Sequence, residues 1–498
     1  MPTLKYKMYI DGNLEESSSK DYFDVVNPAT EQIIAKVPKG TKEDAKKAID
    51  AARESFDRGV WAGKMPAERS QVLWKLADLV EQNADRLARL ESVNVGKTIK
   101  YSRNSDLPFI IDNFRFFSGT ARMLEGKSAA EYSGMGTSII RREPLGVVAS
   151  IVPWNYPLYI AVWKIAPALA AGNSLVVKPA SLTPLTLLEF TKLAEKAGIP
   201  KGVFNVVTGS GEIMGEELTR NKKVDMVAFT GDTETGKKIM ASASSTVKRV
   251  HLELGGKAPL VVLPDADIET VAQGAVVGGF WNTGQDCTAV TRVLVHEDKY
   301  EQVSKTMAQK AKQFRLGDPL NKNTDMGPLV SGKQRERVEN FIQKGVEEGA
   351  KVLTGGKRPE KLKRGFYLEP TILKDTTQDM TVCMEEVFGP VIAVYSYSKL
   401  GEAIEQANSV DYGLAASVYG KDITACMKVA NQLDFGTVWI NEHGILVSEM
   451  PHGGFKQSGF GKDQSLYSFE EYTRIKHVYI DLTGQARKPW HYTVFGKK

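Results

Sequence analysis

The chain has 498 residues, too many for one ordinary hydrophobic core, so two or three domains are expected. Its composition, 42% hydrophobic and 25% charged, is typical of a soluble globular protein. The net charge of +5 is small for this length and the basic residues are scattered, which argues against a nucleic-acid-binding protein.

The cysteines and the apolar segments indicate a cytoplasmic protein without a metal site or a membrane span. Three cysteines, Cys287, Cys383 and Cys426, are too few and too widely spaced for a disulfide framework or a structural zinc site. The N-terminus shows no apolar signal core, so secretion is not expected. The most apolar region, residues 146–171, is interrupted by prolines, an asparagine and a lysine, and we interpret it as buried core.

The first part of the chain is predicted to be scaffold. Residues 5–35 have the pattern of short strands and turns, with Asp11-Gly12 beside alternating apolar residues as a hairpin signal. From residue 41 to about residue 116 the periodicity is helical, with an apolar stripe at Ala45, Ile49, Ala52 and Phe56. Residues 128–142 then have the character of an exposed strand.

Residues 146–254 alternate between strands and helices. Residues 146–151 form a continuous apolar run, as expected for a strand that is buried on both faces of a parallel sheet. Further strands are predicted at 174–177, 204–207, 226–229 and 249–254, and helices at 157–171, 183–197, 213–220 and 233–243. This order predicts an α/β fold with a parallel, doubly wound sheet.

A second α/β region is predicted from residue 255 to about residue 441. Its predicted helices lie at 300–314, 334–349 and 400–407, and its predicted strands at 391–395 and 415–419. Residues 473–482 alternate like a strand but have no sheet of their own, so we expect them to pair with an edge elsewhere in the chain or in another subunit.

Cys287 and Glu253 are the clearest candidates in the sequence for a nucleophile and its base. Glu253, in E-L-G-G-K, lies at the predicted end of a parallel strand, where ligands bind, although a solvated loop carboxylate is the alternative. Cys287, in G-Q-D-C, stands among small or polar residues, which favours a nucleophile over a buried structural thiol. Because a thiol nucleophile needs a base or a lowered pKa, a carboxylate that meets it in space would make a reactive pair.

Further candidate residues follow the predicted strands. Asn155, in P-W-N-Y-P, either caps a helix or donates an amide N–H to an oxyanion. Gly209, Gly211 and Gly215 read G-x-G-x-x-x-G, one residue longer than the usual dinucleotide motif, and plain turn geometry is the alternative. Lys178, at the end of its strand in V-V-K-P, is a candidate for a ribose or a 2′-phosphate contact.

A helix N-terminus near Gly231 and Gly236 is a second candidate for a phosphate site. Asp232 lies at this cap, where its carboxylate favours the helix dipole but would repel a pyrophosphate.

Taken together, these residues resemble the aldehyde dehydrogenase superfamily over nearly the whole chain. Seven motifs occur in the family's order: P-W-N-Y-P, V-V-K-P, F-T-G-x-T-x-x-G, L-E-L-G-G-K, G-Q-x-C, E-E-V-F-G-P and H-G-G-F-K-Q-S-G-F-G-K. The resemblance implies NAD(P)-dependent oxidation of an aldehyde to a carboxylic acid.

The resemblance assigns four catalytic roles. Cys287 would attack the aldehyde to give a thiohemiacetal, and Asn155 with the Cys287 N–H would hold its oxyanion. Hydride transfer to the nicotinamide would leave a thioester, from which Glu253 would release the acid by activating water. Lys164 matches a position that is linked to charge relay in relatives.

The resemblance also assigns cofactor contacts. Lys178 and Glu386 match positions that hold the two riboses, and Phe388 matches one that packs beside the nicotinamide. The other matched positions are Ile151, Pro153, Trp154, Ser181, Gly211, Gly215, Phe229, Gly231, Asp232, Thr235 and Leu254.

The family fold implies three parts. These are a cofactor-binding domain (1–127 and 143–254), a catalytic domain (255–445) and a strand arm for oligomerisation (128–142 and 473–498). The resemblance also implies a homodimer or homotetramer, the usual assemblies in this family.

Three positions depart from the family pattern. Many NAD-preferring relatives have Glu where Ser181 stands, so loss of that charge predicts that NADP is accepted as well as NAD. Asp232 replaces a residue that is more often Ser or Gly, and Asp463 one that is often Glu, so the pyrophosphate pose and a relay role for Asp463 stay open.

The substrate is predicted to be an amino- or trimethylammonio-aldehyde. The runs S-E-M-P-H-G-G-F-K-Q-S-G-F-G-K-D and S-L-Y-S-F-E-E-Y-T resemble γ-aminobutyraldehyde and betaine aldehyde dehydrogenases. Tyr156, Trp163 and Trp281 would form an aromatic wall for the cationic end, and Asp106 and Glu449 are candidate counter-charges. Ordinary packing or a solvated rim is the alternative for these five residues, and glyceraldehyde, succinate semialdehyde and aliphatic aldehydes stay open as substrates.

Two other protein classes are disfavoured. An inactive structural homologue would be expected to have lost Cys287, Glu253 or Asn155, and all three are present. A cysteine hydrolase would need a partner histidine, and none of the six histidines stands in a recognisable Cys-His motif.

Overall fold

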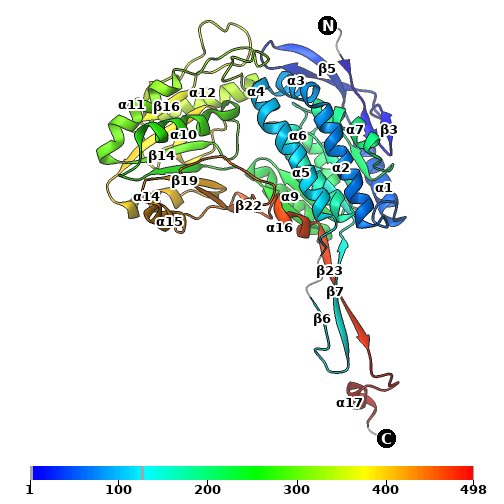
Figure 1. The fold of residues 1–498 in the computed structure, drawn as a ribbon. Coiled ribbons are helices and arrows are strands. Elements are labelled where there is room, and N and C mark those ends of the chain that lie inside the picture. Colours follow the sequence, from blue (N-terminus) through cyan, green and yellow to red (C-terminus); the bar gives the residue numbers. More distant parts are fainter. Residues whose placement is uncertain (1–3, 125–127, 497–498) are drawn as a thin grey trace.

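The computed structural model, which describes residues 4–124 and 128–496, contains two α/β bodies and a projecting arm (Figure 1). One body is built mainly from the first half of the chain and the other mainly from residues after 257. The arm leaves the first body as a narrow strand ribbon, and the C-terminus lies at its far end (Figure 1). No helix within the described residues is both long and apolar enough to cross a membrane.

The first body is organised around an eight-stranded sheet. Its strands lie in the order β22 (Gly459–Phe460), β12 (Arg249–Glu253), β11 (Met226–Thr230), β8 (Val147–Ile151), β9 (Ser174–Lys178), β10 (Phe204–Val206), β2 (Met8–Ile10) and β3 (Asn13–Glu15). The five strands from β12 to β10 are parallel. Every residue of β8, β9 and β11 is buried, which confirms the predicted doubly wound sheet.

Helices cover both faces of this sheet. One face packs against α2 (Pro66–Gln82), α3 (Ala84–Val95), α5 (Leu107–Thr120), α6 (Pro157–Ala171) and α7 (Leu185–Ala197). The other face packs against α1 (Lys42–Asp57), α8 (Glu216–Arg220) and α9 (Thr233–Ala243). Pro157 begins α6, and Gly172, in the left-handed region at φ 97°, ends it. The helix predicted at 213–220 instead begins as a π-helical turn at Gly211–Gly215.

The second body has a seven-stranded sheet. Its order is β15 (Lys351–Thr354), β16 (Thr371–Lys374), β17 (Val391–Tyr397), β14 (Val290–His296), β13 (Ala258–Val262), β19 (Ala415–Tyr419) and β20 (Thr437–Ile440). All neighbours except β15 and β16 are parallel. Helices α10 (Ile268–Phe280) and α11 (Tyr300–Ala311) pack on one face, and α12 (Gly332–Glu347), α14 (Leu400–Asn408) and α15 (Ile423–Ala430) pack on the other.

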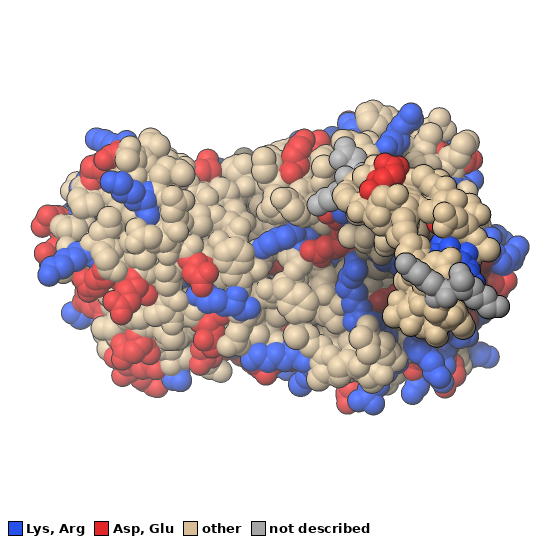
Figure 2. Space-filling view, turned by 90° about the horizontal axis from the view of Figure 1, so that it is seen from below, with Lys and Arg blue, Asp and Glu red and all other residues tan. Residues whose placement is uncertain are grey.

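The arm gives the C-terminal strand its partner. β23 (Thr473–Asp481) pairs antiparallel with β7 (Gly136–Pro144) along its whole length, and β6 (Ala129–Ala130) continues the sheet. Ile475, Tyr479 and Ile480 of β23 are 65%, 45% and 44% exposed, so this sheet presents apolar side chains to solvent. Figure 2 views the molecule from below, from the end to which the arm projects in Figure 1. On this face, Lys and Arg side chains are mixed with Asp and Glu side chains.

Short elements complete the chain. They are β1 (Leu4–Lys5), β4 (Tyr22–Asn27), β5 (Gln32–Pro38), α4 (Ile99–Tyr101), β18 (Tyr412–Gly413), β21 (Phe455–Lys456), α13 (Thr381–Met384), α16 (Ser465–Glu471) and α17 (Tyr492–Phe495). The predicted hairpin at Asp11-Gly12 joins β2 to β3, with both turn residues at positive φ. The domain boundaries at 142, 254 and 445 stay a prediction, and the one at 127 lies outside the described residues.

Candidate active site

Glu253 and Cys287 meet at the carboxyl edge of the first sheet. A cleft of about 1100 Å³ opens there, lined by residues that follow β8, β9, β11 and β12 and by Cys287 and Glu386 from the second body. In a parallel sheet this edge is where ligands bind, because strand ends and helix N-termini converge there.

The loop that carries Cys287 has an unusual backbone. After α10 the chain turns through Asn282 and Thr283, which both have left-handed φ values, of 48° and 61°. Thr283 Oγ1 donates to Gly327 O at 3.1 Å, and Gln285 Oε1 accepts the Val330 N–H at 2.9 Å. Such strained residues persist only where surrounding contacts hold them, and they cluster at functional sites.

A close backbone contact holds the Cys287 loop against the connection between the two bodies. A Cβ on Gly256 would lie 2.1 Å from the carbonyl oxygen of Cys287, so any side chain there would push the cysteine loop away. This contact explains why the last residue of the glycine pair in E-L-G-G-K, Gly256, has no side chain.

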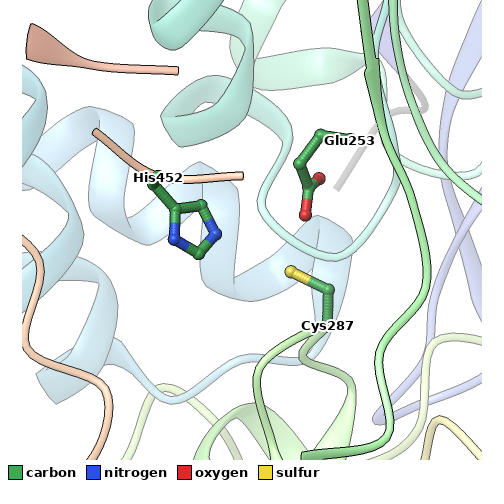
Figure 3. A group of neighbouring side chains, drawn as sticks. All are labelled: Glu253, Cys287 and His452. Atoms are coloured by element: carbon green, nitrogen blue, oxygen red, sulfur yellow. The ribbon is translucent and has the colours of Figure 1, made fainter. Parts of the chain in front are cut away.

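Three side chains from distant segments point toward one another at the site (Figure 3). One ligand-type atom each of Glu253, Cys287 and His452 lies within 4.8 Å of the others. Burial raises the pKa of Glu253 from 4.5 to about 7. Burial also raises the pKa of the Cys287 thiol well above its ordinary value, and the Glu253 and Asp286 carboxylates add to that shift.

His452 is a functional candidate that the sequence did not indicate. Burial lowers its pKa from 6.5 to about 4, so the imidazole is neutral at physiological pH. It lies between β20 and β21, far in sequence from Cys287, and no Cys-His motif marks the pair. The absence of a Cys-His motif thus did not exclude a histidine near Cys287 in space.

Asn155 is positioned by the Cys287 loop itself. Its side chain is buried, and Nδ2 donates to Gln285 O at 3.0 Å while Asn282 Nδ2 donates to Asn155 O at 3.0 Å. An amide carries two N–H groups, so one stays available toward the cleft, which Asn155 also lines.

Lys164 belongs to a buried network behind Glu253. Its Nζ lies 2.6 Å from Asp463 Oδ2, and neither side chain is exposed to solvent. His251 Nε2 approaches the same oxygen at 3.4 Å, and His251 Nδ1 lies 2.8 Å from Glu471 Oε2. Burial opposes ionisation of Asp463, but Lys164 and His251 outweigh it and hold its pKa below the usual range. Asp463 is thus the charge partner of Lys164.

Thirteen of the fourteen predicted cofactor residues line the cleft. They are Ile151, Pro153, Trp154, Lys178, Gly211, Gly215, Phe229, Gly231, Asp232, Thr235, Leu254, Glu386 and Phe388. The exception is Ser181, whose Oγ donates to Gly209 O at 2.9 Å.

The residues that line the cleft suit a nicotinamide dinucleotide. A Cβ on Gly231 would lie 2.4 Å from the Phe229 ring and one on Gly255 would lie 2.6 Å from Glu386 Oε2, so both glycines keep the cleft open. Burial lowers the pKa of Lys178 to about 8 and raises the pKa of Glu386 to about 7. A lysine and a carboxylate in one cleft suit ribose hydroxyls.

Asp232 is the N-cap of α9. Its Oδ1 accepts the Thr235 N–H at 2.9 Å, so this donor is already used at the helix end that would otherwise face a phosphate. Basic side chains that the sequence did not single out, Arg220, Lys238, Lys333 and Arg337, line the same cleft.

The predicted aromatic residues share one cluster. Tyr156, Trp163 and Trp281 pack together with Ile160, which also lines the cleft. Phe109 and Tyr159 also belong to this cluster, but the sequence did not indicate them. Helical spacing alone does not say which face of a helix meets this cluster. Other side chains already cover some of the ring faces. Trp281 stacks on Tyr101 at 3.9 Å between ring centroids, and Lys97 Nζ lies 4.3 Å from the Tyr156 ring centre.

The two predicted counter-charges are not brought together. Asp106 is buried in an ion pair with Lys97, which also lies 3.5 Å from Glu91. Glu449 is exposed, on the segment between β20 and β21. The carboxylate that does meet the aromatic cluster is Asp286, whose Oδ2 accepts the Tyr156 hydroxyl at 2.6 Å.

The fold and this site define a family. The chain belongs to the aldehyde dehydrogenase family, whose model matches residues 14–478. It is 45% identical over 478 residues to a betaine aldehyde dehydrogenase of Bacillus subtilis, covering 96% of this chain and 97% of that protein.

Solved structures agree with this assignment. A betaine aldehyde dehydrogenase of Staphylococcus aureus in complex with NAD⁺ superimposes with a TM-score of 0.95 at 40% identity, over 97% of this chain and 96% of that one. The NAD⁺ complex of an aldehyde dehydrogenase from Bacillus cereus gives a TM-score of 0.94 at 42% identity, over 96% and 97% of the two chains.

Replacement of Lys164 by methionine should destabilise the fold by about 3–5 kcal/mol, because it leaves the buried Asp463 carboxylate without its main charge partner. Urea unfolding followed by circular dichroism measures this loss. Lys237→Met is the matched control, since Lys237 pairs with Glu234 at 2.7 Å on the surface, and it should cost less than about 1 kcal/mol. Equal effects of the two substitutions would contradict a structural role for the buried pair.

Proposed function

We propose that this protein oxidises an aldehyde to a carboxylic acid through a covalent bond to Cys287. The observation that carries the proposal is the meeting of a partly buried thiol with a buried carboxylate whose pKa is raised to about 7, at the edge of a dinucleotide-sized cleft. An inactive structural homologue is the alternative from another class, and retention of Cys287, Glu253 and Asn155 disfavours it.

Cys287 begins the reaction as nucleophile. Its thiol proton is lost to Glu253, whose carboxylate lies within 4.8 Å of the sulfur, as the sulfur adds to the aldehyde carbon. The free N–H of Asn155 Nδ2 and the Cys287 N–H stabilise the oxyanion of the thiohemiacetal. Bound nicotinamide supplies the hydride acceptor.

Glu253 completes the reaction by hydrolysing the thioester. The proton that Glu253 took from Cys287 first passes to solvent. The carboxylate then takes a proton from water, and the hydroxide adds to the acyl carbon and releases the Cys287 sulfur, which takes the proton back from Glu253. Lys164 and Asp463 act on this step at a distance: Lys164 favours the charged form of Glu253 and Asp463 disfavours it. A base with a pKa near 7 suits physiological pH, because it is partly ionised and still basic enough to take the proton.

The steady-state rate should therefore rise with pH through about 7. Below this value Glu253 is protonated and cannot act as a base, so the rate should fall about tenfold for each further pH unit. Glu253→Gln should lower kcat by about 10²–10⁴ and abolish this acid limb. Glu253→Asp, which keeps the carboxylate, should retain the limb. A limb of unchanged midpoint in the Gln variant, measured as kcat between pH 5.5 and 8.5, would sink the assignment.

For the cofactor we propose that both NAD and NADP are accepted. The two solved relatives cited above are NAD⁺ complexes, and Ser181 carries no charge that would repel a 2′-phosphate. Ser181 lies beside the cleft-lining residues Ala180 and Leu182, close enough for a longer side chain to enter it.

Ser181→Glu should shift preference toward NAD by about tenfold in the ratio of kcat/KM values, because a phosphate carries about two negative charges. Ser181→Gln has the same size without the charge and should change both cofactors alike. Initial rates with each cofactor measure the ratio. An equal shift in the Gln variant would mean that size, not charge, decides the preference.

For the substrate we propose an aldehyde with a cationic far end, such as an amino- or trimethylammonio-aldehyde. The support is the aromatic cluster beside Cys287 together with the Asp286 carboxylate, since cations bind well on ring faces near a negative charge. The name of the Bacillus subtilis relative agrees with this choice. Glyceraldehyde, succinate semialdehyde and aliphatic aldehydes are the alternatives for the same chemistry.

A panel of aldehydes tests the substrate class. γ-Aminobutyraldehyde and betaine aldehyde should give the highest kcat/KM, measured by absorbance of the reduced cofactor. Asp286→Asn should lower that value at least about tenfold more for these two than for a neutral alkyl aldehyde, because only the charged end meets the carboxylate. A preference for glyceraldehyde or succinate semialdehyde would keep the mechanism and refute the substrate class.

We also propose that the arm joins copies of this chain into a homodimer or homotetramer in the cytoplasm. Exposed apolar side chains on β23 and beyond it, including Leu482 at 62% and Trp490 at 68% exposure, support an interface there.

A further inference from the structure

Glu253, Cys287 and His452 form the group of three neighbouring metal-ligand side chains that the described part of the chain contains. They come from the end of β12, the loop after α10 and the segment between β20 and β21, and they point into a common space (Figure 3). Sequence reasoning predicted no metal site, because no two of these ligands share a motif.

Two of the three ligands are buried without a hydrogen-bond partner in the described structure. Both carboxylate oxygens of Glu253 and Nε2 of His452 lack one, and each residue is only 1% exposed. The other ring nitrogen of His452 is 3.5 Å from Thr437 Oγ1. A buried polar atom without a partner is costly, so an ion that binds all three side chains would relieve this cost.

We propose that Glu253, Cys287 and His452 bind a divalent transition-metal cation of the zinc class, which reversibly inhibits the enzyme. A thiolate, an imidazole and a carboxylate are the ligand set that Zn²⁺ accepts, whereas Mg²⁺ and Ca²⁺ require mainly oxygen ligands. Three protein ligands leave the fourth tetrahedral position open toward the cleft.

The distances suit such a site after small side-chain rotations. Ordinary Zn–S, Zn–N and Zn–O bonds place tetrahedral ligand atoms about 3.5 Å apart, and here the three atoms already lie within 4.8 Å of one another. Binding releases the Cys287 thiol proton to solvent, so affinity should increase with pH.

Inhibition follows from which groups the metal occupies. The bound ion would hold the sulfur that attacks the aldehyde and the carboxylate that activates water, so both chemical steps would stop together. This inhibitory role rests on the proposed function, but binding itself does not and is measured without any aldehyde.

Cobalt is the probe for binding, because Co²⁺ bound to a thiolate has a charge-transfer band in the near ultraviolet. Chelator-treated full-length protein should bind one Co²⁺ per chain with this band, and Zn²⁺ should displace it. Cys287→Ser should abolish the band, which also excludes the buried Cys383 and Cys426 as its source. His452→Phe and Glu253→Gln should each weaken Co²⁺ binding at least about tenfold.

Matched controls separate loss of a ligand from loss of fold. Phenylalanine keeps the edge-to-face packing of residue 452 on Trp163, whose ring centre lies 5.4 Å away. His477→Phe removes an exposed histidine of the arm and should leave cobalt binding unchanged. Circular dichroism confirms that each variant is folded.

A second measurement follows the thiol. Zn²⁺ should slow labelling of Cys287 by a thiol reagent at least about tenfold in the wild-type protein, and much less in His452→Phe. A cobalt band that is absent from the wild type, or that persists unchanged in folded His452→Phe, would overturn the proposal. Inactivity toward every aldehyde together with a normal cobalt band would refute the proposed function but not the metal site.

Discussion

The backbone contact between Gly256 and Cys287 is the constraint on which the site depends. Strand β12 of the first body ends at Glu253, and β13 of the second body begins at Ala258, so only a short connection joins the two bodies here. Within it, Gly256 lies against the cysteine carbonyl with no room for a Cβ. The base at the end of β12 and the nucleophile on the loop after α10 are therefore held at a fixed separation by main-chain packing rather than by a side-chain bond.

Burial and ion pairing determine which carboxylates at the site are ionised. The Glu253 and Asp286 carboxylates act on Cys287, whereas Asp463, which acts on Glu253, has a buried lysine beside it. Burial raises the pKa of Glu253 to about 7, whereas Asp463 stays ionised. The two buried carboxylates thus differ in protonation because Lys164 forms a direct ion pair with Asp463 but none with Glu253.

The sequence predicted the central strands because a continuous apolar run such as residues 147–151 has few other uses. It predicted Glu253, Cys287 and Asn155 because their motifs are dense in polar or small residues. It did not predict His452, or the pairing of Asp106 with Lys97, because both depend on which segments the tertiary fold brings together. The π-helical turn at Gly211–Gly215 was also missed, since helical periodicity does not distinguish it from an α-helix.

One segment serves two parts of the site. His452 and Asp463 are joined by a pair of backbone hydrogen bonds, His452 N–H to Asp463 O at 2.9 Å and Asp463 N–H to His452 O at 2.7 Å. The residues between them form a closed loop that carries an imidazole to the thiol and a carboxylate to Lys164. An insertion or deletion within this loop shifts one end against the other, and a side chain at Gly454, Gly459 or Gly461 would collide with its neighbours. In evolution or in protein engineering, the length of the loop and these three positions are thus held constant.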